Sequence, residues 1–249
     1  MRGVWIKVFT VCAIAVAACG CQSPGSINAL GPSGFAGDVA ANSEAPPSIA
    51  MPAGAPAIAP PGFVGFCLRM QDQCDGSPDG QSVVAATPAV WQTLNRVNAQ
   101  VNAAIAPETD EDHYGRGEYW TIPTDGYGDC EDYALAKRKA LIEAGLPMDA
   151  LRVAVVRLWD GERHAVLTVS TTKGDYVLDS LEPAILPWTK VSYTWVERQT
   201  TNPWNWAALG DVSSGELLAR AAEDAKAQKT ARLEMPSTPM PQKVAFAER

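Results

Sequence analysis

One predicted helix and the loop before it decide the fold, and they are encoded by Gly128-Asp129-Cys130-Glu131-Asp132-Tyr133-Ala134 and the residues up to Glu143. The residues after Asp129 are good helix formers, and Asp129 itself can cap the first turn. Gly145 and Pro147 predict where the helix ends. Cys130 therefore falls in the first turn, where the positive end of the helix dipole and unpaired N–H groups favour a thiolate over a thiol.

Three β-rich segments follow this helix, at residues 151–158, 164–170 and 175–181. The pairs Asp160-Gly161 and Lys173-Gly174 stand between them as tight-turn signals. Short strands joined by tight turns are typical of an antiparallel meander, which is the arrangement we expect here.

Further helices are predicted on both sides of this region. Thr87 is an N-cap followed by Pro88 at the first helical position, and apolar side chains then recur at three- and four-residue steps until Pro107. Residues 214–235 predict an Ala-rich, weakly amphipathic helix, and residues 236–249 a disordered tail. The predicted fold class is α+β, with N-terminal helices followed by a short antiparallel sheet.

The N-terminus has the pattern of an export signal. Arg2 and Lys7 are basic, and the apolar stretch 8–18 is shorter than the ~20 residues that a membrane-spanning helix needs. The residues before Cys19 resemble a bacterial lipobox, and Cys21 is a second possible lipid acceptor. An ordinary signal peptide remains the alternative, so we expect a periplasmic protein that is either soluble or lipid-anchored.

Residues 22–62 have the composition of a tether. They contain 10 Ala, 8 Pro, 6 Gly and 5 Ser with two charged residues, and such a segment buries too little apolar surface to offset its chain entropy. We therefore expect a flexible, partly polyproline-like linker. The predicted domains are a signal peptide at 1–21, this linker at 22–62, a folded domain at 63–210, and a C-terminal helix and tail at 211–249.

Composition excludes some classes of protein. The chain has 249 residues, of which 47% are hydrophobic, so full-length disorder is excluded. With 20 Lys and Arg against 28 Asp and Glu, its net charge of −8 argues against sequence-independent nucleic-acid binding. The two histidines, His113 and His164, lie too far apart to match the ligand spacing of a Cys2His2 zinc site.

The cysteines divide into groups once export is taken into account. Cys67 and Cys74 can form a short-loop disulfide in an oxidising compartment. Cys130 is then the one thiol left in the mature domain. An odd thiol in an exported protein is either a reactive group or a small buried hydrophobe.

One interpretation is that the Cys130 thiol is the nucleophile of a catalytic triad. His164 opens the second predicted strand and Asp179 lies near the end of the third. The turn between these strands offsets the two residues, so a bulge or a different loop is expected to bring them together. The imidazole would then take the thiol proton, the carboxylate would fix its tautomer, and helix-terminal N–H groups would stabilise an oxyanion.

Other interpretations of the same residues stay open. His113 is a competing imidazole, but its acidic loop would raise its pKa rather than keep it a neutral base. Trp120 could supply an oxyanion-hole or stacking group, or pack in the core. Without catalysis, Cys130 would belong to a non-catalytic envelope interaction module.

A set of motifs between Gly62 and Leu209 resembles the bacterial transglutaminase-like cysteine peptidase family. The resemblance implies a papain-like α+β core in which Cys130 is the nucleophile, His164 the general base and Asp179 the orienting acid. Ser180 departs from the family, which usually has Asn there. The matching motifs are the segment 128–134, Lys137-Arg138, His164-Ala165-Val166-Leu167, Tyr176-Val177-Leu178-Asp179, Phe66-Cys67 with Cys74, Val97-Asn98 with Val101-Asn102, Trp120 with Pro123, and Arg198-Gln199.

The resemblance also implies partners. The best-known members of the family are LapG-type periplasmic proteases that clip large surface adhesins and depend on calcium. We therefore expect a protein substrate, with a large adhesin as the candidate, and an inner-membrane regulatory receptor. The lipobox-like start and the long tether are not standard for the adhesin-releasing members. Acyl transfer to an amine, as in transglutaminases, uses the same triad and is the alternative reaction.

Calcium is the expected cofactor. Asp129, Glu131 and Asp132 crowd Cys130 with negative charge, which raises a thiol pKa and opposes thiolate formation. A hard divalent cation bound by these carboxylates would remove that penalty and order the loop. The same three positions match the calcium site of the resembled proteases. The alternative is that Asp129 caps the helix and no metal binds.

Overall fold

The structure is a computed structural model that describes residues 44–77 and 79–234. The expected signal peptide with Cys19 and Cys21, the first half of the expected linker and the tail 236–249 lie outside the described residues. Among the residues described, no helix combines the length and apolar character that crossing a bilayer requires.

A seven-stranded antiparallel sheet forms the centre of the domain, with strand order β1-β9-β8-β4-β5-β6-β7. A separate two-stranded parallel sheet joins β2 to β3. The predicted meander is confirmed as the consecutive neighbours β4, β5 and β6. The strands are β1 Ala55–Ala57, β2 Ala106–Pro107, β3 Tyr127–Gly128, β4 Leu151–Arg157, β5 Arg163–Thr171, β6 Gly174–Leu178, β7 Leu186–Pro187, β8 Thr194–Gln199 and β9 Trp206–Ser213.

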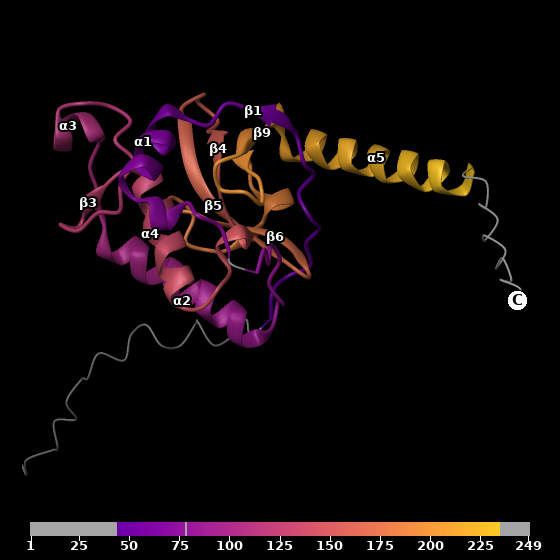
Figure 1. The fold of residues 1–249 in the computed structure, drawn as a ribbon, viewed down its shortest axis with the longest axis horizontal. Helices are drawn as coiled ribbons and strands as arrows, with labels where there is room; N and C mark the ends of the chain where they lie inside the picture. Colours follow the sequence, from indigo (N-terminus) through magenta and orange to yellow (C-terminus); the bar gives the residue numbers. More distant parts are fainter. Residues whose placement is uncertain (1–43, 78, 235–249) are drawn as a thin grey trace, which may run out of the picture. The chain divides into compact units, whose positions relative to one another are not determined.

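Helices α1, α2 and α4 lie on the same side of this sheet (Figure 1). The predicted helix start at Thr87 is confirmed, because its side-chain oxygen accepts a hydrogen bond from the Val90 backbone N–H at 3.2 Å. The helices are α1 Pro61–Arg69, α2 Pro88–Ala104, α3 Asp110–Tyr114, α4 Cys130–Glu143 and α5 Ser214–Glu234, with the 3-10 turns η1 Gln71–Gln73, η2 Met148–Ala150 and η3 Trp188–Lys190.

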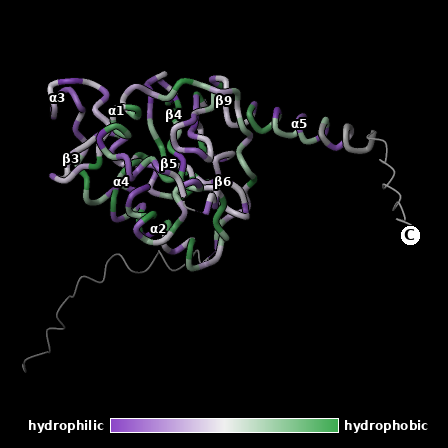
Figure 2. The backbone as a smooth tube through the Cα atoms, viewed as in Figure 1, coloured by the Kyte–Doolittle hydropathy of each residue, from purple (hydrophilic) through white to green (hydrophobic). Residues whose placement is uncertain are grey.

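The sheet is buried on both faces, so its strands carry apolar side chains at successive positions. Val153 and Val155 of β4 pack in the core under the helices, whereas Ala154 and Val156 pack in a second core with Trp188 of η3. Side chains alternate between the two faces of a strand, which assigns them to the two cores. Figure 2 shows hydrophobic residues concentrated along β4, and hydrophilic ones around α3 and β3.

The second core also receives the first turn of α5. Leu217 is buried there, while the side chains at 218–227 are exposed apart from half-buried Ala221. The expected C-terminal helix is therefore confirmed over Ser214–Glu234, and its N-terminal turn is the part that packs on the domain.

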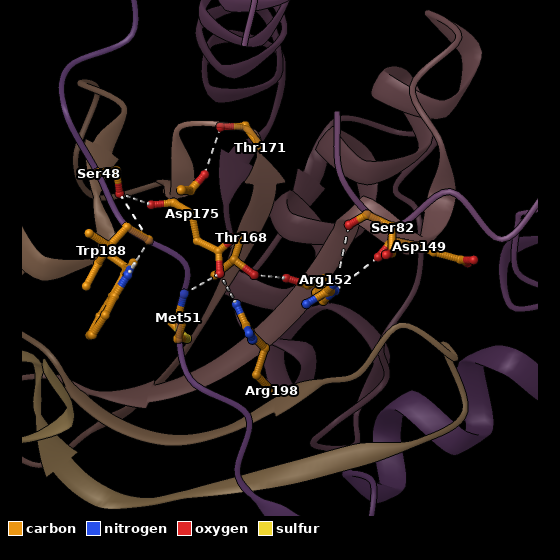
Figure 3. Close-up of polar contacts among 12 residues, drawn as sticks. Ser48, Met51, Ser82, Asp149, Arg152, Thr168, Thr171, Asp175, Trp188 and Arg198 are labelled. Atoms are coloured by element: carbon orange, nitrogen blue, oxygen red, sulfur yellow. Dashed lines mark hydrogen bonds and ion pairs between the residues drawn. The ribbon is translucent and has the colours of Figure 1, made fainter. Parts of the chain in front are cut away.

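Residues 44–60 form an extended strap along the sheet, where the sequence predicts a flexible linker. The backbone of Ile49 accepts hydrogen bonds from Asp175 N at 2.9 Å and Trp188 Nε1 at 2.9 Å, and Met51 N donates to the Asp175 carboxylate at 2.8 Å (Figure 3). Further along, β1 pairs with β9. Composition missed this order because specific partners satisfy the backbone of the strap, rather than a hydrophobic core of its own.

The expected disulfide is confirmed, since Cys67 of α1 and Cys74 after η1 are bonded, with their Cα atoms 5.7 Å apart. Cys130 is the one free cysteine among the described residues. The partition of thiols predicted for the mature domain therefore holds over this part of the chain.

Candidate active site

Cys130 is the first residue of α4, as predicted. The chain reaches it through Gly128, where an added Cβ would lie 2.7 Å from an oxygen of Asp132, so only glycine fits this approach. Asp129 occupies the N-cap position, but among the described residues its side chain makes no capping hydrogen bond. Its Oδ2 instead accepts a long bond of 3.4 Å from Asp110 N. The expected capping role of the Asp129 side chain is therefore wrong.

His164 and Asp179 form the imidazole–carboxylate pair expected from the sequence. His164 Nε2 lies 2.7 Å from Asp179 Oδ1, and the two side chains are only 4% and 2% exposed. Of the two arrangements expected to bring them together, the structure has the different loop and no bulge between β5 and β6. The hairpin closes with Thr171 opposite Gly174, and continuing the register beyond Leu167 and Leu178 makes His164 and Asp179 diagonal neighbours. The diagonal distance of about 7–8 Å is within reach of a long side chain.

The thiol and the imidazole line one small pocket between α4 and β5. Cys130 and His164 line it together with Pro60, Trp120 and Ala165. The Ala165 backbone N–H also supports the thiolate form of Cys130 by hydrogen bonding. Because Asp179 engages Nε2, Nδ1 is the ring nitrogen of His164 that remains to take a proton from the thiol.

The electrostatics on the helix side oppose the thiolate. Cys130 Sγ donates a hydrogen bond to Glu131 Oε2 at 3.1 Å. Burial, and then the Glu131 carboxylate, raise the pKa of Cys130 well above its usual range. Burial and the neighbouring Asp129 in turn raise the pKa of Glu131 to about 9. Burial and carboxylates thus outweigh the favourable helix N-terminus that the sequence predicts for this thiol.

A cluster of three carboxylates lies beside the thiol. Oxygens of Asp110, Asp129 and Asp132 all lie within 4.8 Å of one another. Asp129 Oδ1 and Asp132 Oδ2 are buried, with no hydrogen-bond partner among the described residues. Burial raises the pKa of all three, that of Asp132 to about 7. Like charges held this close without a counter-ion are costly, which is the condition that a bound cation relieves.

The structure divides the predicted metal-binding set and adds a residue to it. Asp129 and Asp132 lie in the carboxylate cluster, whereas the Glu131 carboxylate lies at the thiol, where it groups with Asp129 and Cys130. Asp110 is the residue that sequence reasoning missed, although the acidic run 108–112 was a signal for it. Its carboxylate accepts a hydrogen bond from Tyr119 N, which turns it inward to 4% exposure.

The two alternative site residues lie in different surroundings. His113 of α3 pairs with Asp125 at 2.9 Å and stacks on Tyr114, outside the pocket that Cys130 lines. Trp120 lines the pocket but is 2% exposed and packs edge-on against the core aromatic Phe63, so the expected core role is confirmed, and an oxyanion-hole or stacking role stays a prediction. Its indole N–H donates to Glu118 Oε2 at 3.0 Å.

Two further side chains reach Asp179 that the sequence did not single out as site residues. The Tyr193 hydroxyl donates to Asp179 Oδ2, and Asn102 of α2 donates to the Asp179 backbone carbonyl at 2.9 Å. Tyr193 lies in a loop before β8, where no local pattern marks it. Asn102 belongs, with Asn98, to the motifs that resemble the family, and no pattern in the sequence assigns it a contact with Asp179.

Comparison with known proteins identifies the family of the chain. The family model described as bacterial transglutaminase-like cysteine proteinase matches residues 53–214. No curated protein matches the chain. Calcium-bound Legionella pneumophila LapG is 29% identical, with 55% of this chain and 82% of that chain covered and a TM-score of 0.42.

Two further structures of Legionella pneumophila LapG are similar to the chain. One is 32% identical, covers 51% of this chain and 73% of that chain, and has a TM-score of 0.43. The EGTA-treated form is 33% identical, covers 46% and 64%, and has a TM-score of 0.39. Since the family model spans more than half of the sequence and the observed α+β architecture fits it, the chain belongs to the bacterial transglutaminase-like cysteine proteinases and is a cysteine peptidase.

Proposed function

We propose that the protein is an exported cysteine protease that cuts a protein substrate with Cys130, His164 and Asp179. The observation that carries this proposal is the 2.7 Å bond between His164 Nε2 and Asp179 Oδ1, with the imidazole and the thiol on one pocket. A buried imidazole held by a carboxylate and facing a helix-terminal thiol is the arrangement that acyl transfer requires.

The reaction follows from the proton positions. His164 Nδ1 takes the Cys130 proton, and the thiolate attacks the scissile carbonyl carbon while backbone N–H groups at the start of α4 bind the oxyanion. His164 then returns the proton to the departing amine as the C–N bond breaks, leaving a thioester on Cys130. A water molecule, deprotonated by His164, hydrolyses the thioester and restores the thiol.

The carboxylate cluster fits a calcium ion. Calcium binds hard oxygen ligands, and two of the cluster's buried oxygens have no other partner among the described residues. Asp110, Asp129 and Asp132 would hold the ion, whereas the Glu131 carboxylate contacts the thiol. The bound cation would supply positive charge that lowers the thiol pKa against the surrounding carboxylates.

The substrate and location follow from the family and the N-terminus rather than from the pocket. We propose a periplasmic protein, soluble or anchored through a lipid at Cys19 or Cys21, that clips a large surface adhesin under control of an inner-membrane receptor. Protein cleavage is the part of this proposal that membership of a peptidase family supports directly.

The decisive experiment incubates the full chain with a co-encoded large exported repeat protein, in parallel with Cys130→Ala. We expect a discrete fragment with the wild type and none with the variant. A fluorescent primary amine in the same reaction tests acyl transfer, because label incorporated without a new fragment would identify a transglutaminase. Identical outcomes for both proteins, with slow alkylation of the single free thiol, would identify a non-catalytic module instead.

A further inference from the structure

The carboxylate of Asp179 is held from three directions. Its Oδ1 accepts hydrogen bonds from His164 Nε2 at 2.7 Å and from the Leu181 backbone N–H at 3.0 Å. Its Oδ2 accepts a bond from the Tyr193 hydroxyl. The Leu181 bond comes from the local backbone, so among the described residues Tyr193 is the one side chain besides the imidazole that hydrogen-bonds this carboxylate.

Tyr193 contacts the imidazole as well as the carboxylate. It lies between η3 and β8, and its ring meets the His164 ring edge-on, with centroids 6.0 Å apart at an interplanar angle of 65°. An edge-on aromatic pair restricts rotation of the imidazole, and the hydroxyl restricts rotation of the carboxylate. One side chain therefore touches both partners of the 2.7 Å bond.

The hydroxyl is a permanent donor at this position. Burial, and then the hydrogen bond and charge of Asp179, raise the pKa of Tyr193 far above its usual range. Although burial acts to raise it, the bonds from His164 and Tyr193 keep the pKa of Asp179 below its usual range. The phenol is thus neutral and the carboxylate charged, so the hydroxyl donates and the carboxylate accepts.

We propose that Tyr193 is a positioning residue that extends the triad, holding Asp179 and His164 so that Nδ1 faces the Cys130 thiol. This inference rests on the proposed roles of Cys130, His164 and Asp179. Tyr193 does not touch the reacting atoms; it acts by removing the freedom of the carboxylate and ring to leave the productive geometry.

The test compares Tyr193→Phe with Tyr176→Phe in the full chain with calcium present. Tyr176 is a matched control, because its buried hydroxyl also makes one hydrogen bond, to the Pro46 carbonyl in the strap. The first measurement is the rate at which iodoacetamide alkylates Cys130 at neutral pH. We expect Tyr193→Phe to be slower by about tenfold, as misplacement of a catalytic base predicts, and Tyr176→Phe to match the wild type.

The second measurement is the NMR signal of the imidazole protons, which is simple because the chain has two histidines. In the wild type we expect a downfield Nε2–H signal from His164 that exchanges slowly with water. Tyr193→Phe should broaden it or speed its exchange and leave the His113 signal unchanged. A structural role of Tyr193 alone would change the melting temperature without this selective effect.

A double-mutant cycle with Asp179→Ala completes the test. If Tyr193 acts through the carboxylate, adding Tyr193→Phe to Asp179→Ala causes little further loss. Wild-type alkylation and an unchanged His164 signal in Tyr193→Phe, or independent losses in the cycle, would overturn the proposal. His164→Ala separates the two levels of inference, because an unchanged alkylation rate in that variant would overturn the triad itself.

Discussion

The two sides of the active site differ in how completely the chain satisfies its own charges. On the sheet side, both oxygens of Asp179 are hydrogen-bonded, and His164 and Tyr193 are in contact. On the helix side, Asp129 and Asp132 each bury an oxygen without a partner among the described residues. The fold therefore satisfies the carboxylate on the sheet side, whereas it leaves two buried carboxylate oxygens on the helix side without a hydrogen bond among the described residues.

If calcium binds at the proposed site, this difference indicates which groups the ion would affect. On the helix side, burial raises the pKa of the four acids Asp110, Asp129, Glu131 and Asp132. On the sheet side, hydrogen bonds keep the pKa of Asp179 low although it is buried. A cation can therefore change the nucleophile without disturbing the base and its orienting acid. The comparison predicts large effects from variants on the sheet side in all conditions, and effects from variants on the helix side that depend on calcium.

The largest expected effect is that of His164→Ala. Loss of the general base should slow substrate cleavage by about 10²–10⁴-fold, with or without calcium. The matched control is His113→Ala, which removes the other imidazole together with its pairing to Asp125 and should retain activity. The cleavage rates of the two variants decide which histidine is the general base. An equal loss in both variants would show that His113 also contributes to catalysis.

Calcium removal should have the next largest effect. At a concentration one hundred times its dissociation constant, a bound ion adds about 2.7 kcal/mol to the free energy of unfolding. We expect EGTA to lower the melting temperature and to slow iodoacetamide alkylation of Cys130. Equal alkylation rates in EGTA and in calcium would contradict the proposed site.

The free energy of unfolding of the calcium-free chain should depend on pH because of the same buried carboxylates. Folding raises the pKa of Asp132 to about 7 and that of Glu131 to about 9, against unfolded values near 4. The folded state then binds more protons than the unfolded state, so stability is highest at low pH and falls as pH rises.

We expect the free energy of unfolding in EGTA to fall by roughly 1 kcal/mol per pH unit between pH 5 and pH 7. Asp179 does not reverse this trend, because its lowered pKa acts below that window. Urea unfolding at several pH values measures the slope, and calcium should flatten it. A slope that is level or rising in EGTA would show that the cluster is not strained by its own charges.

The smallest expected effect is that of Asp132→Asn on the free energy of unfolding, which should change sign between calcium-free and calcium-containing buffer. Without calcium, removing one like charge should stabilise the chain by about 1 kcal/mol, and with calcium the lost ligand should make the variant less stable than the wild type. Asp149→Asn is the control, since Asp149 is also buried and also accepts a backbone hydrogen bond, from Ser77 N at 2.8 Å, as Asp132 does from Thr121 N at 2.8 Å, but lies outside the carboxylate cluster. It should lose stability equally in both conditions. Parallel melting curves for Asp132→Asn in both conditions would contradict the prediction.

Local patterns predicted the elements that carry the triad. The helix that begins at Cys130 and the strands that carry His164 and Asp179 are encoded by nearby capping, periodicity and turn residues. The diagonal register was beyond such reasoning, because it depends on where the hairpin closes. The resulting offset of two residues left the pair on one face without a bulge.

Two residues outside these elements were not predictable in the same way. Tyr193 reaches the site from a loop whose position depends on the whole fold, and no local pattern marks it. Asp110 begins α3, and the acidic run 108–112 marks it only as one of several carboxylates. The order of the strap was not predictable from its local sequence either. Its Ala- and Pro-rich composition predicts disorder, yet the buried pair Asp175 and Arg198 supplies a partner for its backbone at Met51.

The disulfide between Cys67 and Cys74 affects which cysteines pair when the chain is oxidised. Cys67 and Cys74 are seven positions apart, whereas pairing either of them with Cys130 would close a loop roughly eight to nine times longer. Loop-closure entropy then disfavours the wrong pairing by about 2 kcal/mol. The local bond is therefore favoured over either competing pair, and it leaves Cys130 as the free thiol among the described residues.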